Sequence, residues 1–330
     1  MRPYAPLLAL FVVACGDGAD PSSLGSRSSD PTSETAPAGA QTAPPSTNDT
    51  PPTSPADPAP ATDPPKDPST TPPAKSYAQG PSAGCSKPTG AKGLQTKTMT
   101  IAGKTRDYLR FIPAGYTPGK AVKLVLGFHG SGGTDTKARD MFALEANAGN
   151  DAIFIYPQGL PDPAFGGDNR WDPTMGSDNY TFVDALITAA ETNYCIDRDH
   201  VFAVGFSNGA RFTSMLGCYR GDKLRAIAPV APGGDNNTLP LDKGQCVGEV
   251  SIWEGVGTED PDHIPGAELV RDHYRMANGC ATTKTATTPA GCDSYDACRS
   301  PLKSTYCTYP GGHAWPPIGT NAVWSFFSKT

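Results

Sequence analysis

Short apolar runs alternate with amphipathic segments along most of the chain beyond residue 94. In 180–193, Phe182, Leu186, Ile187 and Ala190 recur at the spacing of one helix face. The apolar runs between such segments are short and uninterrupted, as in strands that are buried on both faces. The pattern predicts a hairpin over 96–112, strands at 123–128, 152–156, 201–204, 226–230, 250–253 and 304–308, and helices at about 137–148, 180–193, 209–219, 266–276 and 321–328.

This alternation of strands and helices indicates the class of fold. It is typical of α/β proteins, in which a mostly parallel central sheet has helices on both faces. Catalytic residues of such folds lie in loops at the carboxyl ends of strands. Candidate chemistry is therefore expected where a predicted strand ends.

Composition divides the chain into two parts. Between residues 16 and 84 lie 16 of the 35 prolines and a single aromatic residue, Tyr77. Such a stretch cannot bury enough apolar surface to offset the entropy lost on ordering. We therefore expect a disordered Pro/Ser/Thr-rich tether over 15–84 and one folded domain over 85–330. The tether holds eight acids and three bases, whereas the remainder is nearly neutral, which argues against nucleic acid as a partner.

The first residues are typical of an export signal. Arg2 precedes a short apolar stretch that ends at Cys15. The sequence Val12-Val13-Ala14-Cys15 resembles the bacterial lipobox, which predicts a lipoprotein signal peptide over 1–14 and a lipid anchor on Cys15. The alternative is an ordinary signal peptide with an incidental cysteine. No apolar run reaches about 18 residues, so no transmembrane helix is expected.

Eight further cysteines lie at or beyond Cys85. An even number in an exported domain predicts disulfides, and we expect four, with the pairing left open among 105 possibilities. The sequence has no Cys-x-x-Cys pair and its five histidines are scattered. No metal site is therefore expected.

The strongest catalytic signal is the Gly-x-Ser-x-Gly motif at 205–209. A predicted strand precedes it and a predicted helix follows, so Ser207 is expected on a sharp turn with its hydroxyl exposed. The alternative is a plain turn in which Ser207 only caps the helix. A nucleophilic serine in this fold requires an acid and then a histidine further along the chain.

The base and the acid are expected after two later strands. His313 follows the last predicted strand and two glycines, whereas His273 lies in a helical pattern and His263 beside acids in a loop. We therefore predict His313 as the base. Asp260 is the preferred acid, with Asp262 second and Glu259 third.

A glycine-rich turn after the strand 123–128 is suited to binding an oxyanion. The backbone N–H of Ser131 in this turn would act together with that of Asn208. The alternative is a phosphate-binding loop, which we discount because the Gly-Lys-Ser/Thr ending is lacking.

Several short motifs follow one another between about residues 85 and 330: His129-Gly130, Tyr156-Pro157-Gln158-Gly159, Trp171, Asp178, the motif at 205–209, Gly257-Thr258-x-Asp260, Asn278-Gly279-Cys280 and Gly311-Gly312-His313. In this order they resemble a known family, the secreted feruloyl esterases and polyhydroxybutyrate depolymerases of the first carbohydrate-esterase family. The resemblance implies the α/β-hydrolase fold and a catalytic triad of Ser207, Asp260 and His313. The sequence departs from the family pattern at two positions. Asn208 stands where relatives often have Met, and Val256 stands where they often have His.

We expect His129, Trp171 and Trp315 in the substrate-binding region, although Trp171 has an alternative interpretation as a packed loop aromatic. The predicted protein is an exported, monomeric serine esterase that acts on ester-bearing polymers or small esters without a cofactor. A feruloyl esterase is preferred, and a poly(3-hydroxybutyrate) depolymerase or an acetylxylan esterase is the alternative. A different class, a catalytically silent surface lipoprotein that binds polysaccharide, is opposed by the intact Ser, Asp and His.

Overall fold

The computed structural model describes residues 79–330, except 89, 235–238 and 242–245. The predicted signal peptide, the predicted lipid-anchor residue Cys15 and nearly all of the predicted tether lie outside the described residues.

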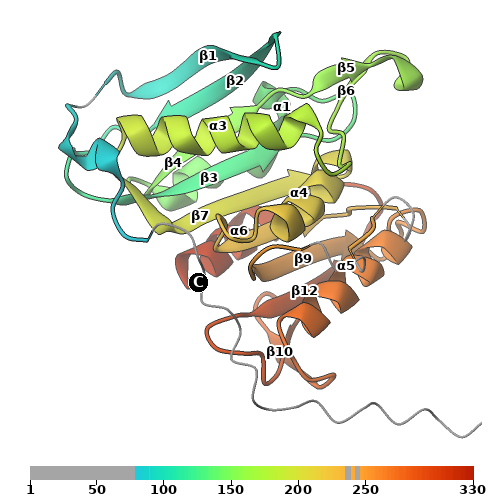
Figure 1. Ribbon diagram of the computed structural model, residues 1–330. Coiled ribbons are helices and arrows are strands. Elements are labelled where there is room, and N and C mark those ends of the chain that lie inside the picture. The colour runs from blue at the N-terminus through green and yellow to red at the C-terminus, as the bar shows by residue number, and fades with distance from the viewer. Residues whose placement is uncertain (1–78, 89, 235–238, 242–245) are drawn as a thin grey trace, which may run out of the picture. The chain divides into compact units, whose positions relative to one another are not determined.

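A ten-stranded sheet forms the centre of the described domain (Figure 1). Its order is β1 (Gly93–Ile101), β2 (Lys104–Ile112), β4 (Ala152–Pro157), β3 (Val122–Phe128), β7 (Ile196–Phe206), β8 (Ala226–Val230), β9 (Ser251–Gly257), β12 (Ser304–Tyr309), β11 (Cys292–Tyr295) and β10 (Lys284–Thr287). The strands from β4 to β12 in this order pair in parallel, and antiparallel strands flank them at both edges. The predicted α/β fold with a mostly parallel sheet is confirmed.

Helices cover both faces of this sheet, and each face has its own apolar core. On one face lie α3 (Asp178–Asn193), α4 (Asn208–Tyr219) and α5 (Ile264–Ala277), whose buried residues include Phe182, Phe212 and Val270. On the other lie α1 (Asp135–Phe142), α2 (Leu144–Ala148) and α6 (Gly319–Ser328), which bury Phe142, Leu144 and Phe327. In Figure 1 the long helix α3 crosses the sheet on the side nearest the viewer.

Some elements differ from the expectation. The predicted helix over 137–148 is two helices, because Ala143 has a left-handed backbone with φ 46° that ends α1 and begins α2. Two short hairpins are additional: β5 (Leu160–Asp162) with β6 (Asp168–Arg170), and β10 with β11. Short 3-10 turns lie at Ala83–Ser86 and Pro163–Phe165.

The cysteines from Cys85 onward form four disulfides, which confirms that prediction. The pairs are Cys85–Cys195, Cys218–Cys246, Cys280–Cys298 and Cys292–Cys307. The last two pairs lie in the segment that leads to β12, where little apolar side chain is available. Disulfides at this number are typical of proteins exported from the reducing cytoplasm.

The first described residues contact the segment at the start of the central strand β7. Ser82 donates hydrogen bonds from its N–H to Ile196 O and from its Oγ to Tyr194 O, and Cys85 is bonded to Cys195. Residues 80–84, which composition assigns to the end of the tether, thus contact the start of β7.

None of the helices in the described part of the chain is long and apolar enough to cross a membrane.

Candidate active site

Ser207 lies on the sharp turn between β7 and α4. Its backbone has φ 56° and ψ −122°, a conformation that a non-glycine residue adopts only at a cost. The two glycines of the motif make the turn possible, because a side chain at Gly205 would clash with Gly209 and one at Gly209 would clash with the backbone of Phe128. The serine hydroxyl is thereby lifted above the carboxyl end of the central strand.

The three predicted triad residues are hydrogen-bonded in series. His313 Nε2 lies 2.9 Å from Ser207 Oγ, and His313 Nδ1 lies 2.8 Å from Asp260 Oδ2. An Nδ1–H donated to the carboxylate leaves Nε2 as the acceptor that faces the serine hydroxyl. The arrangement has the geometry that activates a serine for nucleophilic attack.

Asp260 is selected among its neighbours by burial and by the loop that carries it. Asp260 is 4% exposed, whereas Glu259 and Asp262 are exposed to solvent and have no bond to His313. The loops after β9 and β12 are joined by two backbone bonds, from Thr258 N–H to Tyr309 O and from Glu259 N–H to Gly311 O. This close approach brings the aspartate and the histidine together across 53 residues of sequence.

His263 is a site residue that the sequence analysis places only in a loop. Its Nδ1 lies 2.7 Å from Asp260 Oδ1, so the two carboxylate oxygens of Asp260 each bond to a different imidazole. The rings of His263 and His313 stack with centroids 3.7 Å apart and planes 14° apart. The spacing Asp-x-x-His at the start of a helix was the available signal, since residues i and i+3 of a first turn are neighbours.

Three potential metal-ligand atoms, one each from Asp260, His263 and His313, lie within 4.8 Å of one another. Both carboxylate oxygens are already bonded to imidazole nitrogens. A cation held here would have to displace those bonds and would compete for the base that faces Ser207. The donor set therefore fits a hydrogen-bonded catalytic group better than a metal centre.

The glycine-rich turn after β3 passes directly beside the serine. A Cβ at Gly130 would lie 3.1 Å from Ser207 Cβ, so only glycine permits this approach without displacement. The turn is held by hydrogen bonds from Gly132 N–H to Asn169 O and from Gly133 N–H to Gly130 O, both 3.0 Å. Asn208 is the first residue of α4, where a backbone N–H has no partner within the helix. The positions of Ser131 and Asn208 are thus compatible with an oxyanion hole.

His129 is buried beneath this turn rather than facing a substrate. Its side chain is 1% exposed, with Nδ1 2.7 Å from Gly130 O and Nε2 accepting the N–H of Gly159 at 2.9 Å. Burial lowers the pKa of the ring, which favours the neutral form that these two bonds require. The expectation that His129 contacts the substrate is therefore corrected: it holds the backbone of the turn.

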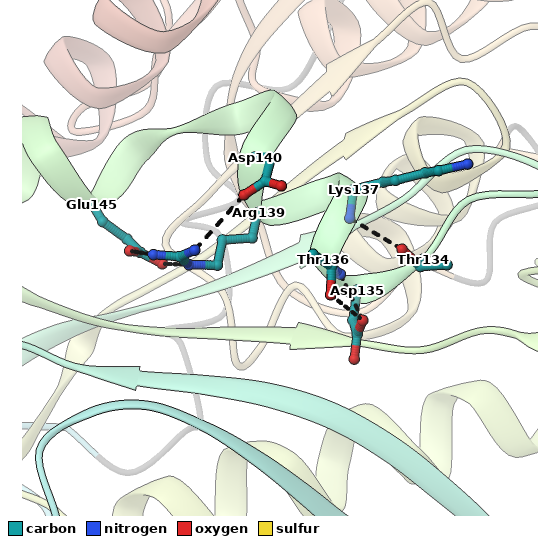
Figure 2. A network of polar contacts seen from close by, with 7 residues as sticks. All are labelled: Thr134, Asp135, Thr136, Lys137, Arg139, Asp140 and Glu145. Carbon is teal, nitrogen blue, oxygen red and sulfur yellow. Dashed lines mark hydrogen bonds and ion pairs between the residues drawn. The ribbon is translucent and has the colours of Figure 1, made fainter. Parts of the chain in front are cut away.

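Polar contacts at the start of α1 fix the other end of the same turn (Figure 2). Thr134 accepts the N–H of Lys137 at 3.1 Å as the helix cap. Further along the helix, Arg139 forms a two-point ion pair with Glu145 at 2.8 and 2.7 Å, which joins α1 to α2. The N–H of Asp135 donates to the side chain of Gln158 at 2.9 Å. The turn is thus anchored at both ends before any substrate arrives.

Both predicted substrate-binding tryptophans are packed against other side chains. Trp171 is 1% exposed, its Nε1 donates to His129 O at 3.0 Å, and its ring lies 5.1 Å from that of Phe128. Trp315 is partly buried with its ring 4.8 Å from that of Phe142. This placement favours the packing interpretation of Trp171, although the residue also lines the larger cavity described below. A substrate contact by Trp171 or Trp315 stays a prediction.

The side chain of Asn208 is bonded to the backbone of Trp171. Its Oδ1 accepts the N–H of Trp171 at 2.7 Å, and its Nδ2 donates to the carbonyl of Trp171 at 3.1 Å. This pair of bonds ties the residue after the nucleophile to the segment beyond β6. The tryptophan and the asparagine thus form one structural unit beside Ser207.

Two neighbouring cavities meet at Asn208, the residue after the serine. The larger, of about 690 Å³, lies between the β5–β6 hairpin and the segment 172–179. Its wall includes Phe165, 53% exposed, and Met175, 47% exposed, and the Arg170 guanidinium lies 3.6 Å over the Phe165 ring. The smaller, of about 270 Å³, is lined by Ser207, Ser131 and His263, among others. Arg170, Asn208 and Arg211 line both cavities.

The fold and the site together define an ester hydrolase of the α/β-hydrolase class. Among solved structures, the chain is similar to an acetyl xylan esterase from Aspergillus awamori, with a TM-score of 0.56 and 16% identity over 71% of this chain and 99% of that one. It is also similar to an S-formylglutathione hydrolase from Agrobacterium tumefaciens, with a TM-score of 0.52 and 11% identity over 72% of this chain and 94% of that one. At these identities the likeness shows the fold.

Curated relatives show the family. The chain is 30% identical over 271 residues to a probable feruloyl esterase C from Aspergillus terreus, covering 75% of this chain and 91% of that protein. It is 30% identical over 270 residues to feruloyl esterase C from Emericella nidulans, covering 74% and 90%. The search of family models gave no match. The chain belongs to the feruloyl esterase family and is a carboxylic ester hydrolase.

Proposed function

We propose that this protein is a serine esterase that cleaves hydroxycinnamoyl esters attached to plant polysaccharides. One observation carries the proposal: a chain 30% identical to feruloyl esterases over most of their length holds Ser207, His313 and buried Asp260 in hydrogen-bonded series. The names of the relatives indicate feruloyl esters. The series of three side chains is the arrangement that makes a serine reactive toward an ester carbonyl.

In the proposed reaction Ser207 Oγ attacks the ester carbonyl while His313 Nε2 takes the hydroxyl proton. Asp260 keeps the His313 ring oriented and stabilises the imidazolium that forms. The N–H groups of Ser131 and Asn208 donate to the negative oxygen of the tetrahedral intermediate. His313 then returns the proton to the departing alcohol, and a water molecule hydrolyses the acyl-enzyme by the same route.

The larger cavity is proposed to hold the hydroxycinnamoyl ring. Its volume of about 690 Å³ falls in the range of small-molecule sites, and it combines apolar surface with a few polar groups. Phe165 and Met175 offer exposed apolar surface for the ring, and Arg170 bridges this cavity to the one that contains Ser207. A ring placed here would lie on one side of the ester bond, with the sugar toward solvent.

Parallel assays distinguish this substrate from the alternatives. We expect the purified protein to hydrolyse methyl ferulate and p-nitrophenyl acetate, and Ser207→Ala to abolish both activities. Activity on acetylated xylan or on poly(3-hydroxybutyrate) with none on methyl ferulate would replace the proposed substrate class. A protein that binds polysaccharide but hydrolyses no ester would instead match the silent lipoprotein.

We further propose that the enzyme is exported as a monomer and held at a membrane by lipid on Cys15. The lipobox-like sequence before Cys15 supports the anchor. The four disulfides support export. An N-terminal anchor would suit an enzyme whose substrate is an insoluble polymer.

A further inference from the structure

His263 is hydrogen-bonded to the second carboxylate oxygen of the triad residue Asp260. Its Nδ1 lies 2.7 Å from Asp260 Oδ1, while His313 Nδ1 lies 2.8 Å from Oδ2. No other side-chain or backbone donor to Asp260 Oδ1 occurs in the described part of the chain. Since Asp260 is 4% exposed, loss of the His263 donor would leave a buried carboxylate oxygen without a partner.

The ring of His263 also covers one face of His313. Their centroids are 3.7 Å apart and nearly parallel, and the Phe206 ring stacks on His313 with a centroid distance of 4.7 Å. His263 itself is the residue that precedes α5, and a side chain at Gly233 would clash with its ring. Glycine at position 233 thus provides the space in which the second histidine fits.

We propose that His263 is a positioning residue for catalysis, and this inference rests on the proposed serine-esterase function. Its Nδ1–H fixes the plane of the Asp260 carboxylate, so that Oδ2 stays directed at His313 Nδ1. Its ring limits tilting of His313. Because a misplacement of about 1 Å between reacting groups costs on the order of a hundredfold in rate, this constraint acts on turnover rather than on substrate binding.

Two substitutions separate the hydrogen bond from the stacked ring. His263→Phe keeps an aromatic ring and removes the donor, whereas His263→Asn places an amide N–H near the position of Nδ1 and removes the ring. With p-nitrophenyl acetate we expect His263→Phe to lower kcat on the order of ten- to a hundredfold with KM nearly unchanged. We expect His263→Asn to restore kcat to within about threefold of the unmodified protein.

The chain provides a matched control in its other Asp-x-x-His pair. His200 Nδ1 lies 2.7 Å from Asp197 Oδ2, with the same spacing of three residues, near the start of β7 and away from the end that carries Ser207. His200→Phe removes the same kind of bond, and we expect it to leave kcat and KM unchanged. A loss of equal size in His200→Phe would mean that the effect is general destabilisation and would overturn the proposal.

Proton NMR of the imidazole N–H groups tests the positioning directly. We expect the downfield resonance of the His313 Nδ1 proton to shift or broaden in His263→Phe, and to remain in His263→Asn and His200→Phe. A resonance unchanged in His263→Phe, or a kcat within twofold of the unmodified protein, would refute the role of His263. Absence of esterase activity in the unmodified protein would instead refute the proposed function, and the NMR comparison would still decide the positioning.

Discussion

The hydroxyl of Ser207 lies 2.9 Å from an imidazole that is 106 positions away in the sequence, and the carboxylate bonded to this imidazole comes from a third segment. A serine hydroxyl alone is a weak nucleophile. It becomes reactive only when the base accepts its proton and the acid stabilises the charged base. The three side chains therefore act as a unit, and the losses caused by removing them do not add.

We expect Ser207→Ala and His313→Ala each to lower kcat by about 10³-fold or more, and the double variant to lose little beyond either one. The measurement is turnover of p-nitrophenyl acetate, with circular dichroism to show that the fold is kept. The proposed triad would be contradicted if the fold-loss in kcat of the double variant equalled the product of the two single losses. An active Ser207→Ala protein would also contradict it.

Two aromatic residues of the larger cavity should respond differently to truncation. Trp171 is 1% exposed, so Trp171→Ala should lower the free energy of unfolding by about 3–5 kcal/mol. Phe165 is 53% exposed, so Phe165→Ala should change that free energy by no more than about 0.5 kcal/mol and raise KM for methyl ferulate. Urea unfolding and steady-state kinetics measure both. If Trp171→Ala instead raised KM for methyl ferulate with little loss of stability, and Phe165→Ala left KM unchanged, Trp171 would be the substrate contact.

At the scale of elements, the strands with continuous apolar runs are the ones that the sequence predicts well. The strand 226–230 is predicted with its observed bounds, because every residue is buried and apolar or proline. The helix break at Ala143 is not predictable, since alanine gives no signal for a left-handed backbone. The strand β10 is exposed at all four positions, so no apolar alternation marks it, and it pairs with β11, whose Cys292 is bonded to Cys307 of β12.

The candidate site divides in the same way. The turn at Ser207 is predictable because strand, glycines and helix are adjacent in sequence. The sequence favours Asp260 but leaves Asp262 and Glu259 open, because only the burial of Asp260 and its bond to His313 distinguish it from these neighbours. The bond from His263 to Asp260 also needs the structure, since a local Asp-Pro-Asp-His run is typical of a solvated loop. Likewise the packing of His129 and Trp171 follows from contacts between distant segments.

The strand β9, which leads to Asp260, carries a buried acid that should make stability depend on pH. Glu254 is 1% exposed, both carboxylate oxygens have no hydrogen-bond partner among the described residues, and burial raises its pKa well above the usual range. An acid with a raised pKa in the folded state binds more protons there than in the unfolded state. The free energy of unfolding therefore falls as pH rises above the pKa that Glu254 has in the unfolded chain.

We expect Glu254→Gln to raise Tm more at pH 8 than at pH 5, because the amide cannot ionise. Thermal unfolding followed by circular dichroism at the two pH values measures the difference. An equal change in Tm at both would show that ionisation of Glu254 does not limit stability.

At the scale of the whole molecule, catalysis and anchoring are expected to be separable. The described residues contain every proposed site residue except Cys15. We expect Cys15→Ser to move the full-length protein from the membrane fraction to the soluble fraction without a change in kcat on p-nitrophenyl acetate, because stable membrane attachment needs the lipid. Cell fractionation and kinetics on the purified protein test this. Persistent membrane association of Cys15→Ser would contradict lipid anchoring.

The bond between Cys85 and Cys195 determines how a mechanical load would travel through the enzyme. A pull from the N-terminal side enters at Pro81 and Ser82, crosses the disulfide and continues along β7 to Ser207. While Ser207 is bonded to the substrate in the tetrahedral intermediate, before the polysaccharide departs as the alcohol, the covalent path between the tether and the polymer bypasses residues 86–194. The strands β1 to β4 then lie outside the covalent path, and the tension runs along β7, a central strand that is hydrogen-bonded to the parallel strands β3 and β8.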